Sequence, residues 1–336
     1  MSGTETPVVE DRVNVVIDRI NRTLPKSASR YAGSIRVYAK WCHDRPHDAF
    51  DVTPLDVEDY LLHLSSDKDY AYQTVSVHQS ALSKFFETAQ KLADGGRLDA
   101  TVPADNPVDD VSLTDVTTTT KTKKEQALEG SEDRHGLPPE KVEKLASAVP
   151  SPTVRNELLV RLMYQGMLRR KEIARLKLSD IDRENRSITI RSDVAKNGES
   201  RTVYYMPTLD RLMRLWIDID RESYALADES EYVFLSNERV HLSRFHVGNI
   251  VVRAAEGADL QSVLYTAADG TEKNTITAHT LRHSGAVRRW SEDENGNGGA
   301  DLRTLQKLLG HESIKTTEKY LDVGDDDLAQ KARNTW

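Results

Sequence analysis

The sequence predicts a mainly α protein of two domains, the first all-helical and the second an α+β domain with a small antiparallel sheet. Three observations support this fold class. Apolar residues recur at spacings of three to four through most of the chain, as in amphipathic helices. Two short alternating runs flank Asn197-Gly198, a dipeptide typical of hairpin turns. Residues 108–136 are polar, Thr-rich and Lys-rich and have no such period, which indicates a linker.

The first domain is expected over residues 1–107. Thr53-Pro54 reads as an N-cap followed by proline at the first helical position, and it opens a helix with an apolar stripe from Val57 to Leu64. A longer helix is expected from about Gln73 to Lys91, with its phenylalanines inward and His78 among the outward residues. The dipeptide Asn106-Pro107 favours a turn and closes the domain.

The second domain is expected over residues 137–336. Helices are predicted at 154–163, 168–173, 208–220, 243–255 and 301–309, and strands at 187–191 and 201–205. A short strand is expected at 232–235 and a second hairpin around Asp269-Gly270. A helix begins near His279, and a further helix covers residues 313–322.

Composition limits the class of protein. The 336 residues are 38% hydrophobic and 30% charged, and they show neither a secretory signal nor a membrane span, so a cytoplasmic protein is expected. One cysteine, Cys42, excludes an internal disulfide framework and a thiolate zinc cluster from this chain alone. The net charge of −8 by itself argues against a nucleic-acid partner, because phosphate affinity comes mostly from Lys and Arg.

The second domain nevertheless carries residues suited to holding and attacking a phosphodiester: Arg169, Lys196, His279, Arg282, His311 and Tyr320. Cleavage without a metal needs donors on the non-bridging oxygens, an activated nucleophile and an acid for the leaving oxygen. Two arginines can grip a phosphate with a permanent charge. His279 and Arg282, three apart at a helix start, are expected on one face.

Tyr320 is the candidate nucleophile. A phenol has an unperturbed pKa of about 10, so it needs a base or a cationic pocket. His279 can act as the base, and Lys196, expected at a mobile hairpin tip, can protonate the leaving oxygen. Gly310 ends a helix and places His311 nine positions before the tyrosine.

Each residue alone has a simpler explanation. A tyrosine after a helical pattern usually packs its ring, Arg169 can pair with Glu172, and Lys196 can be an ordinary turn lysine. His279 and His283 have the spacing of a zinc fragment, but no third ligand is evident. The joint occurrence in chain order favours the catalytic interpretation.

These motifs resemble those of the tyrosine recombinase family, the phage-integrase and Xer-type site-specific recombinases. The first box of the family resembles Gly166 through Leu176 with Arg169, and its hairpin lysine matches Lys196, followed by Arg201 and Val203. The remaining matches are His-x-x-Arg at His279 and Arg282, and Leu-Gly-His with the later tyrosine at His311 and Tyr320. The first domain more loosely resembles the family's SAM-like core-binding domain.

The resemblance implies a DNA recombinase that forms a 3′-phosphotyrosyl link at Tyr320 and exchanges strands through a Holliday junction. It implies a tetramer on two double-stranded DNA sites and no metal or nucleotide cofactor. Arg169 and Arg282 would bind the scissile phosphate, Lys196 would be the general acid, His279 an acid/base and His311 a phosphate donor. The alternatives are a type IB topoisomerase-like enzyme and a DNA-binding protein of this fold without catalysis.

Three features depart from the family pattern or from the expected charge. Met167 stands where the family usually has glycine, which leaves Arg170 as an alternative to Arg169 for the phosphate-binding role. Residues 292–298 form an insertion that resembles the start of a calcium loop, although Thr304 replaces the bidentate glutamate. The acidity is interpreted as a surface adaptation to a salt-rich cytoplasm, as in a halophilic archaeon, its virus or its plasmid. Basic residues are expected to gather near the boxes, namely Arg161, Arg169, Arg170, Arg175, Arg288 and Arg289.

Overall fold

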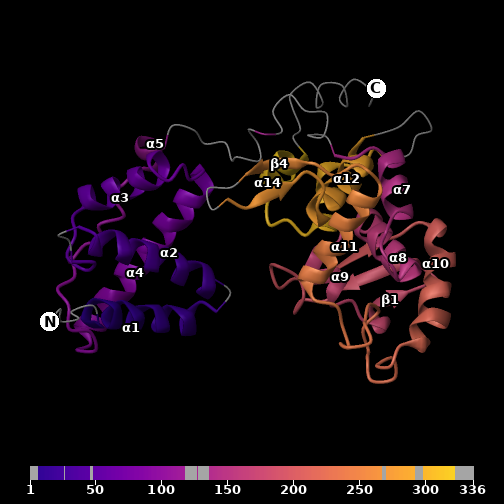
Figure 1. The fold of residues 1–336 in the computed structure, drawn as a ribbon, viewed down its shortest axis with the longest axis horizontal. Coiled ribbons are helices and arrows are strands. Elements are labelled where there is room, and N and C mark those ends of the chain that lie inside the picture. Colours follow the sequence, from indigo (N-terminus) through magenta and orange to yellow (C-terminus); the bar gives the residue numbers. More distant parts are fainter. Residues whose placement is uncertain are drawn as a thin grey trace. The chain divides into compact units, whose positions relative to one another are not determined.

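A computed structural model of the chain describes residues 7–25, 27–45, 48–117, 127, 136–266, 270–291 and 298–321 (Figure 1). The side chains of residues 7–10, 319 and 320 lie outside this description. The chain divides into two compact units. The first comprises residues 1–127 with 266–271, and the second comprises residues 128–265 with 272–336.

The first unit is helical throughout its described secondary structure. Its helices are α1 (Pro7–Thr23), α2 (Ala28–His43), α3 (Pro54–Ser66), α4 (Tyr72–Asp94) and the short α5 (Leu113–Val116). The expected cap of α3 is present, because Thr53 and Asp56 exchange side-chain and backbone hydrogen bonds in a capping box. The apolar stripe of α3 is buried against the other helices of the unit.

His78 was expected on the outer face of α4, and that prediction is wrong. Its side chain is buried, with 6% of the residue exposed, and its Nδ1 lies 2.7 Å from the hydroxyl of Tyr60. Burial lowers the pKa of His78 to about 4. The inward face of α4 runs through Val75, His78, Leu82 and Phe85, so His78 belongs to the same buried stripe as the phenylalanines.

The packed part of the first unit continues beyond Asn106-Pro107. Val108, Val111 and Val116 are buried in the same core as α1 to α4. The amide of Asn106 also binds the backbone and the hydroxyl of Ser83 on α4. The chain therefore leaves this core only after α5, within the segment that the sequence marks as a linker.

The second unit combines helices with two small sheets. Its helices are α7 (Pro139–Ser147), α8 (Thr153–Gln165), α9 (Arg170–Ala174), α10 (Asp210–Arg214), α11 (Arg244–Gly257), α12 (Ala278–Trp290), α13 (Leu302–Leu309) and α14 (Ile314–Leu321). Its strands are β1 (Ile181–Asp182), β2 (Ser187–Ile190), β3 (Arg201–Tyr204), β4 (Val263–Thr266) and β5 (Glu272–Asn274). The predicted mainly α fold class is confirmed.

The first sheet is the predicted antiparallel hairpin with one added strand. Its order is β1-β2-β3, and Ile188 pairs with Val203 while Ile190 pairs with Arg201. The expected helix at 208–220 is divided into a 3-10 turn, α10, a π-helical turn and a second 3-10 turn. The expected strand at 232–235 is reduced to an isolated bridge between Tyr232 and Lys177.

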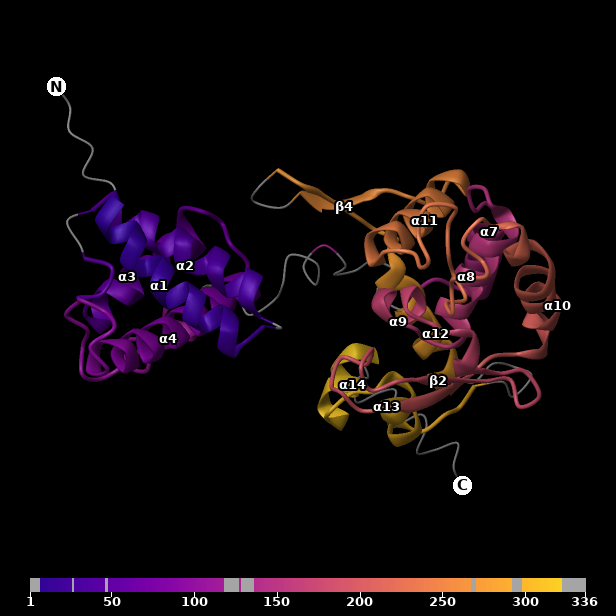
Figure 2. The ribbon, with the colours of Figure 1, turned by 90° about the horizontal axis from the view of Figure 1, so that it is seen from below.

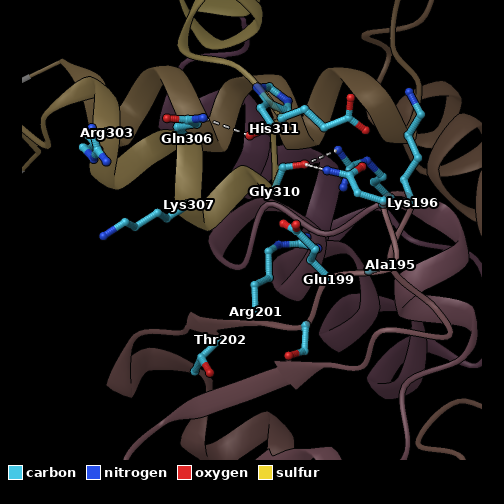
Figure 3. A pocket seen from close by; sticks show the side chains of 14 residues that line it. Ala195, Lys196, Glu199, Arg201, Thr202, Arg303, Gln306, Lys307, Gly310 and His311 are labelled. Atoms are coloured by element: carbon cyan, nitrogen blue, oxygen red, sulfur yellow. Dashed lines mark hydrogen bonds between the residues drawn. The ribbon is translucent and has the colours of Figure 1, made fainter.

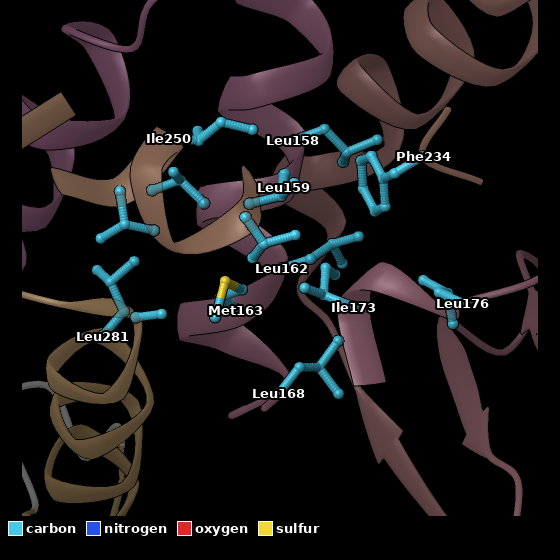
Figure 4. Packing of buried hydrophobic residues seen from close by; sticks show 14 of the residues in the cluster. Leu158, Leu159, Leu162, Met163, Leu168, Ile173, Leu176, Phe234, Ile250 and Leu281 are labelled. Carbon is cyan, nitrogen blue, oxygen red and sulfur yellow. The ribbon is translucent and has the colours of Figure 1, made fainter. Parts of the chain in front are cut away.

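Helix α8 runs through the main core of the second unit, and Figure 4 shows its side chains from Leu158 to Met163 meeting residues of several other elements. Ile173 and Leu176 pack from the α9 side, Ile250 from α11 and Leu281 from α12. No helix of the described residues is long and apolar enough to cross a membrane.

A smaller cluster joins the last helices to the end of α8. Its buried members are Met167, Ala286, Trp290, Leu305, Leu309 and Leu321. Helix α13 also packs against β3, as Figure 2 shows where α13 and α14 lie beside the first sheet. This packing brings the C-terminal helices close to the segment that carries Arg169 and to helix α12, which carries His279 and Arg282.

Candidate active site

The backbone between α8 and α9 is fixed by an unusual conformation. Met167 has φ of 51°, in the left-handed region that favours glycine. Its side chain is fully buried in the small cluster, and its carbonyl accepts a hydrogen bond from Nη1 of Arg282. Met167, which replaces the expected glycine, therefore has a strained backbone conformation, while its side chain packs in the buried cluster.

Glu172 lies at the centre of the site, with 1% of the residue exposed. Its carboxylate pairs with Arg201 at 2.8 and 2.9 Å and with Arg169 at 3.1 Å, and it lies 3.9 Å from Arg282. Burial alone would raise the pKa of Glu172. The hydrogen bonds and charge of Arg201, the charge of Arg282 and the backbone N–H of Arg169 outweigh burial and lower that pKa to about 2.

The C-terminus of α13 is bound by the same arginines. Three successive carbonyls accept hydrogen bonds, Leu308 from Arg201 at 2.8 Å, Leu309 from Arg282 at 2.6 Å and Gly310 from Arg169 at 3.5 Å. These carbonyls have no partner within an α-helix and lie at the negative end of its dipole. The guanidinium groups of Arg169, Arg201 and Arg282 therefore lie together around this helix end.

Gly310 makes the predicted helix stop. It adopts φ 61° and ψ 55°, and a Cβ there would lie 3.1 Å from Cδ of Arg201. The turn that follows presents His311, whose Nδ1 lies 3.0 Å from the hydroxyl of the fully buried Thr317 on α14. Burial, followed by the charges of Arg282 and its neighbours, lowers the pKa of His311 to about 4, so the imidazole is neutral near pH 7.

Arg169, Lys196, Arg201 and His311 line one pocket of about 690 Å³. Figure 3 shows Lys196 at one end of this pocket and Arg303 and Lys307 of α13 at the other. The pocket thus combines several cations from segments that are far apart in the sequence.

Arg282 and His279 both lie on α12, but they differ in exposure. The side chain of Arg282 is 2% exposed, beneath the carbonyls of Met167 and Leu309 that it binds. His279 is exposed in the first turn of the helix and does not line the pocket. Arg282 is directed into the protein, whereas His279 lies at an exposed position of the same helix. The expectation that both act from one face stays a prediction.

Tyr320 lies on α14, and its side chain is outside the described residues. The helix itself is held at two positions, by Thr317 against His311 and by Leu321 in the cluster with Met167. The described part of the site therefore brings Arg169, Lys196, Arg282 and His311 together and holds the backbone of the helix that carries the tyrosine.

Sequence reasoning assigned no site role to Glu172, Arg201 or Asn197. The sequence predicts Glu172 only as an ion-pair partner of Arg169, whereas its carboxylate lies closer to Arg201. Asn197 was considered as a turn residue, yet its Nδ2 donates to the carbonyl of Gly310 at 3.2 Å. Two features of the sequence could have identified Glu172 and Arg201 as site residues. Glu172 lies three positions after Arg169, and Arg201 is the first residue of the second hairpin strand.

Two of the arginines expected to gather near the catalytic motifs bind carboxylates or carbonyls of the second unit. Arg161 pairs with Glu143 and Glu157, and Arg289 donates to the carbonyls of Gln165 and Tyr204. These arginines stabilise the second unit itself. Of the six arginines expected near the motifs, Arg169 lines the pocket.

No group of three or more His, Cys, Asp or Glu side chains suited to a metal ion occurs among the described residues. Residues 292–297, which carry most of the calcium-like pattern, lie outside the described part of the chain. Thr304 binds Asp301, which caps the N-terminus of α13.

Two families match the chain. Residues 136–326 match the family described as "Phage integrase family", and residues 13–92 match "Phage integrase, N-terminal SAM-like domain". The first match covers more than half of the 336 residues.

Three curated relatives that resemble the chain are Xer recombinases. Tyrosine recombinase XerC of Corynebacterium glutamicum is 28% identical over 189 residues, which cover 56% of this chain and 53% of the relative. XerA of Thermococcus kodakarensis is 29% identical over 187 residues, covering 55% and 56%. XerC of Roseiflexus castenholzii is 27% identical over 299 residues, covering 86% and 81%. The chain thus spans little more than half the length of the first two relatives.

Solved structures share the fold. XerH site-specific recombinase bound to palindromic difH substrate has a TM-score of 0.66 and 19% identity, covering 95% of this chain and 83% of that chain. A lambda integrase (75-356) dimer bound to a COC' core site has a TM-score of 0.62 and 20% identity, covering 93% and 96%. At this identity the likeness concerns the fold.

Proposed function

The chain belongs to the phage integrase family, and from this membership we propose that it is a site-specific DNA recombinase. It cleaves a DNA strand through a 3′-phosphotyrosyl link at Tyr320, exchanges strands through a Holliday junction and rejoins them. The observation that carries this proposal is the gathering of Arg169, Arg282, Lys196 and His311 around the C-terminal turn of α13.

The arginines supply the phosphate site. Glu172 holds Arg169 and Arg201 in fixed positions, so the guanidinium groups are preorganised before a phosphate arrives. The two proposed phosphate ligands are Arg169 and Arg282. The Arg169 side chain is 25% exposed and lines the pocket, so it is more accessible than the buried Arg282. Arg282 would reach the phosphate from the inner side after the carbonyl of Leu309 gives up its hydrogen bond.

His311 and Lys196 divide the remaining tasks. A neutral His311 can donate a hydrogen bond to a non-bridging oxygen without carrying a competing charge. Lys196 is exposed at the pocket edge and is the proposed acid for the leaving 5′ oxygen. His279, at the start of α12, is the proposed acid/base for the tyrosine. The reaction proposed here uses these side chains alone, without a metal or a nucleotide cofactor.

The proposed partner is double-stranded DNA carrying recombination sites, bound by a homotetramer in a cytoplasmic setting. Residues 1–107 are proposed to act as the core-binding domain, residues 108–136 as a linker whose first residues pack on that domain, and residues 137–336 as the catalytic domain. Support comes from the two family matches and from the relatives named above.

The test is a nicked suicide substrate, in which the cleaved strand is lost and the covalent adduct accumulates. The parent protein is expected to form a protein–DNA adduct, and Tyr320→Phe is expected to form none while still binding DNA. Absence of an adduct from the parent protein on its own site would favour a DNA-binding protein without catalysis. An adduct that survives the substitution would mean that another residue is the nucleophile.

A further inference from the structure

We propose that Asn197 is a positioning residue, which holds Lys196 beside the scissile phosphate by binding the carbonyl of Gly310. This inference rests on the proposed function and goes beyond it, because it assigns a task to a residue with no catalytic chemistry of its own. The inference explains why the turn between β2 and β3 is hydrogen-bonded to the turn that presents His311.

The chain on the N-terminal side of Lys196 is anchored. Val194 and Ala195 are buried, and the N–H of Ala195 donates to the carbonyl of Arg191 at 2.9 Å. The ammonium of Lys171 binds the carbonyl of Asp193 at 3.2 Å. The backbone entering Lys196 is therefore fixed, although the lysine itself is exposed.

On the other side of Lys196 the anchor is Asn197. Its Nδ2 donates to the carbonyl of Gly310 at 3.2 Å, and in Figure 3 two dashed lines converge on that oxygen. Among the described residues, this is the one side-chain hydrogen bond made from residues 196–200. Gly198 follows with φ of 78° and open space around it, so the tip beyond Asn197 is weakly held.

The second partner of the Gly310 carbonyl is Arg169, at 3.5 Å. The residue next to the proposed acid and a proposed phosphate ligand therefore bind the same atom. This shared carbonyl sets the position of Lys196 relative to the phosphate site. Lys196 thus has an anchored neighbour on each side.

The step that depends on this position is the departure of the 5′ oxygen. His279, the proposed acid/base, takes the proton of the Tyr320 hydroxyl as the tyrosine oxygen forms a bond to phosphorus. The P–O5′ bond breaks, and Nζ of Lys196 gives its proton to the departing oxygen. During rejoining the neutral amine takes that proton back from the 5′ hydroxyl, whose oxygen forms the bond to phosphorus. The bond from phosphorus to the Tyr320 oxygen breaks, and His279 returns the proton to the tyrosine. A misplaced amine slows both directions, whereas binding of the phosphate by the arginines is unaffected.

The experiment compares an ordinary nicked substrate with one that carries sulfur in place of the bridging 5′ oxygen. A thiol with a pKa of about 8.5 leaves as a thiolate and needs no proton in the transition state. On the ordinary substrate, Lys196→Ala is expected to slow adduct formation roughly 10²- to 10⁴-fold, the usual contribution of general acid catalysis. Asn197→Ala is expected to slow it roughly tenfold or more, a partial loss of the same contribution. Both variants are expected to approach the parent rate on the sulfur substrate.

The matched control is Asn185→Ala, in the other turn of the same sheet. Asn185 binds Asp182 at 2.7 Å and lies outside the pocket lining, so its removal is expected to change neither rate. Equal slowing of Asn197→Ala on both substrates, or no slowing on the ordinary one, would overturn the positioning role. Failure of the parent to form any adduct would overturn the proposed function, and the role of Asn197 with it. A Lys196→Ala variant that sulfur does not rescue would remove the general acid and would also overturn the inference.

Discussion

Arg201 grips the carboxylate of Glu172 through two hydrogen bonds, from Nη1 to Oε1 at 2.9 Å and from Nη2 to Oε2 at 2.8 Å. Arg201 opens β3 and Glu172 lies in α9, so this pair joins the sheet to the helix that follows Arg169. The Nε of the same arginine binds the carbonyl of Leu308 at the end of α13. One side chain therefore connects three segments of the site.

Glu172→Gln is expected to destabilise the second unit by about 3 kcal/mol, because it leaves buried arginines without their counter-charge. The pKa of Glu172 falls from 4.5 to about 2 on folding. Its contribution is therefore complete above pH 4.5 and is lost as the pH falls toward 2. Urea unfolding at pH 7 and at acid pH measures both effects, and the variant should lack this acid-dependent loss.

The matched control for Glu172 is Asp210→Asn. Asp210 also accepts hydrogen bonds from two nitrogens of one guanidinium group, that of Arg186, but both side chains are more than a third exposed. Its loss is expected to leave stability almost unchanged, because water and salt screen an exposed ion pair. Equal destabilisation by the two substitutions would contradict the central role of Glu172.

Gly310→Ala is expected to slow adduct formation and to destabilise the protein by about 1–2 kcal/mol, the cost of a left-handed conformation. The added methyl group also meets the side chain of Arg201 at 3.1 Å, which displaces the turn that presents His311. Gly96→Ala is the control, because that glycine lies in the first unit and has φ of 66° with nothing within 4 Å of the new Cβ. A comparable loss of activity in both variants would show that strain alone is responsible.

Met167→Gly and Met167→Ala separate backbone strain from packing. Loss of the buried side chain costs roughly 2–5 kcal/mol in either variant. Glycine also relieves the strain at φ of 51°, so Met167→Gly is expected to be more stable than Met167→Ala by roughly 1 kcal/mol. Thermal unfolding of the two variants provides the comparison, and greater stability of the alanine variant would contradict the strained conformation.

Acid is expected to destabilise the first unit through His78. Burial lowers the pKa of His78 from 6.5 to about 4, so the folded unit keeps a neutral imidazole that the unfolded chain protonates. Stability is complete above pH 6.5 and is lost toward pH 4, by up to roughly 3 kcal/mol. Amide hydrogen exchange in α3 and α4, corrected for intrinsic rates, follows this loss. His78→Gln should flatten the pH dependence, and an unchanged pH dependence in that variant would exclude His78 as the cause.

The salt dependence of activity tests the interpretation of the net charge of −8. At high salt the counterion-release contribution to DNA binding shrinks, and direct contacts such as those of the pocket carry more of the affinity. Adduct formation is therefore expected to persist into molar KCl. An optimum below about 0.15 M would contradict adaptation to a salt-rich cytoplasm.

The sequence by itself determined the local elements, because their causes lie within a few residues. Thr53 and Asp56 form the capping box, Asn197-Gly198 lies between the paired strands, and Gly310 ends α13 in the left-handed conformation. The same local patterns identified Arg169, Lys196, Arg282, His311 and Tyr320 as candidates. The side chain of Tyr320 lies outside the described residues, so its role stays a prediction.

Only the tertiary structure decided how these residues are held. The bond from Arg201 to Leu308 joins positions 107 apart, and the bond from Asn197 to Gly310 joins positions 113 apart. No periodicity within one element encodes such a pairing, which follows from the packing of α13 against β3. The burial of Glu172 and His78 was likewise decided by neighbouring elements, because a polar side chain becomes stable inside a protein only when partners arrive from elsewhere in the fold.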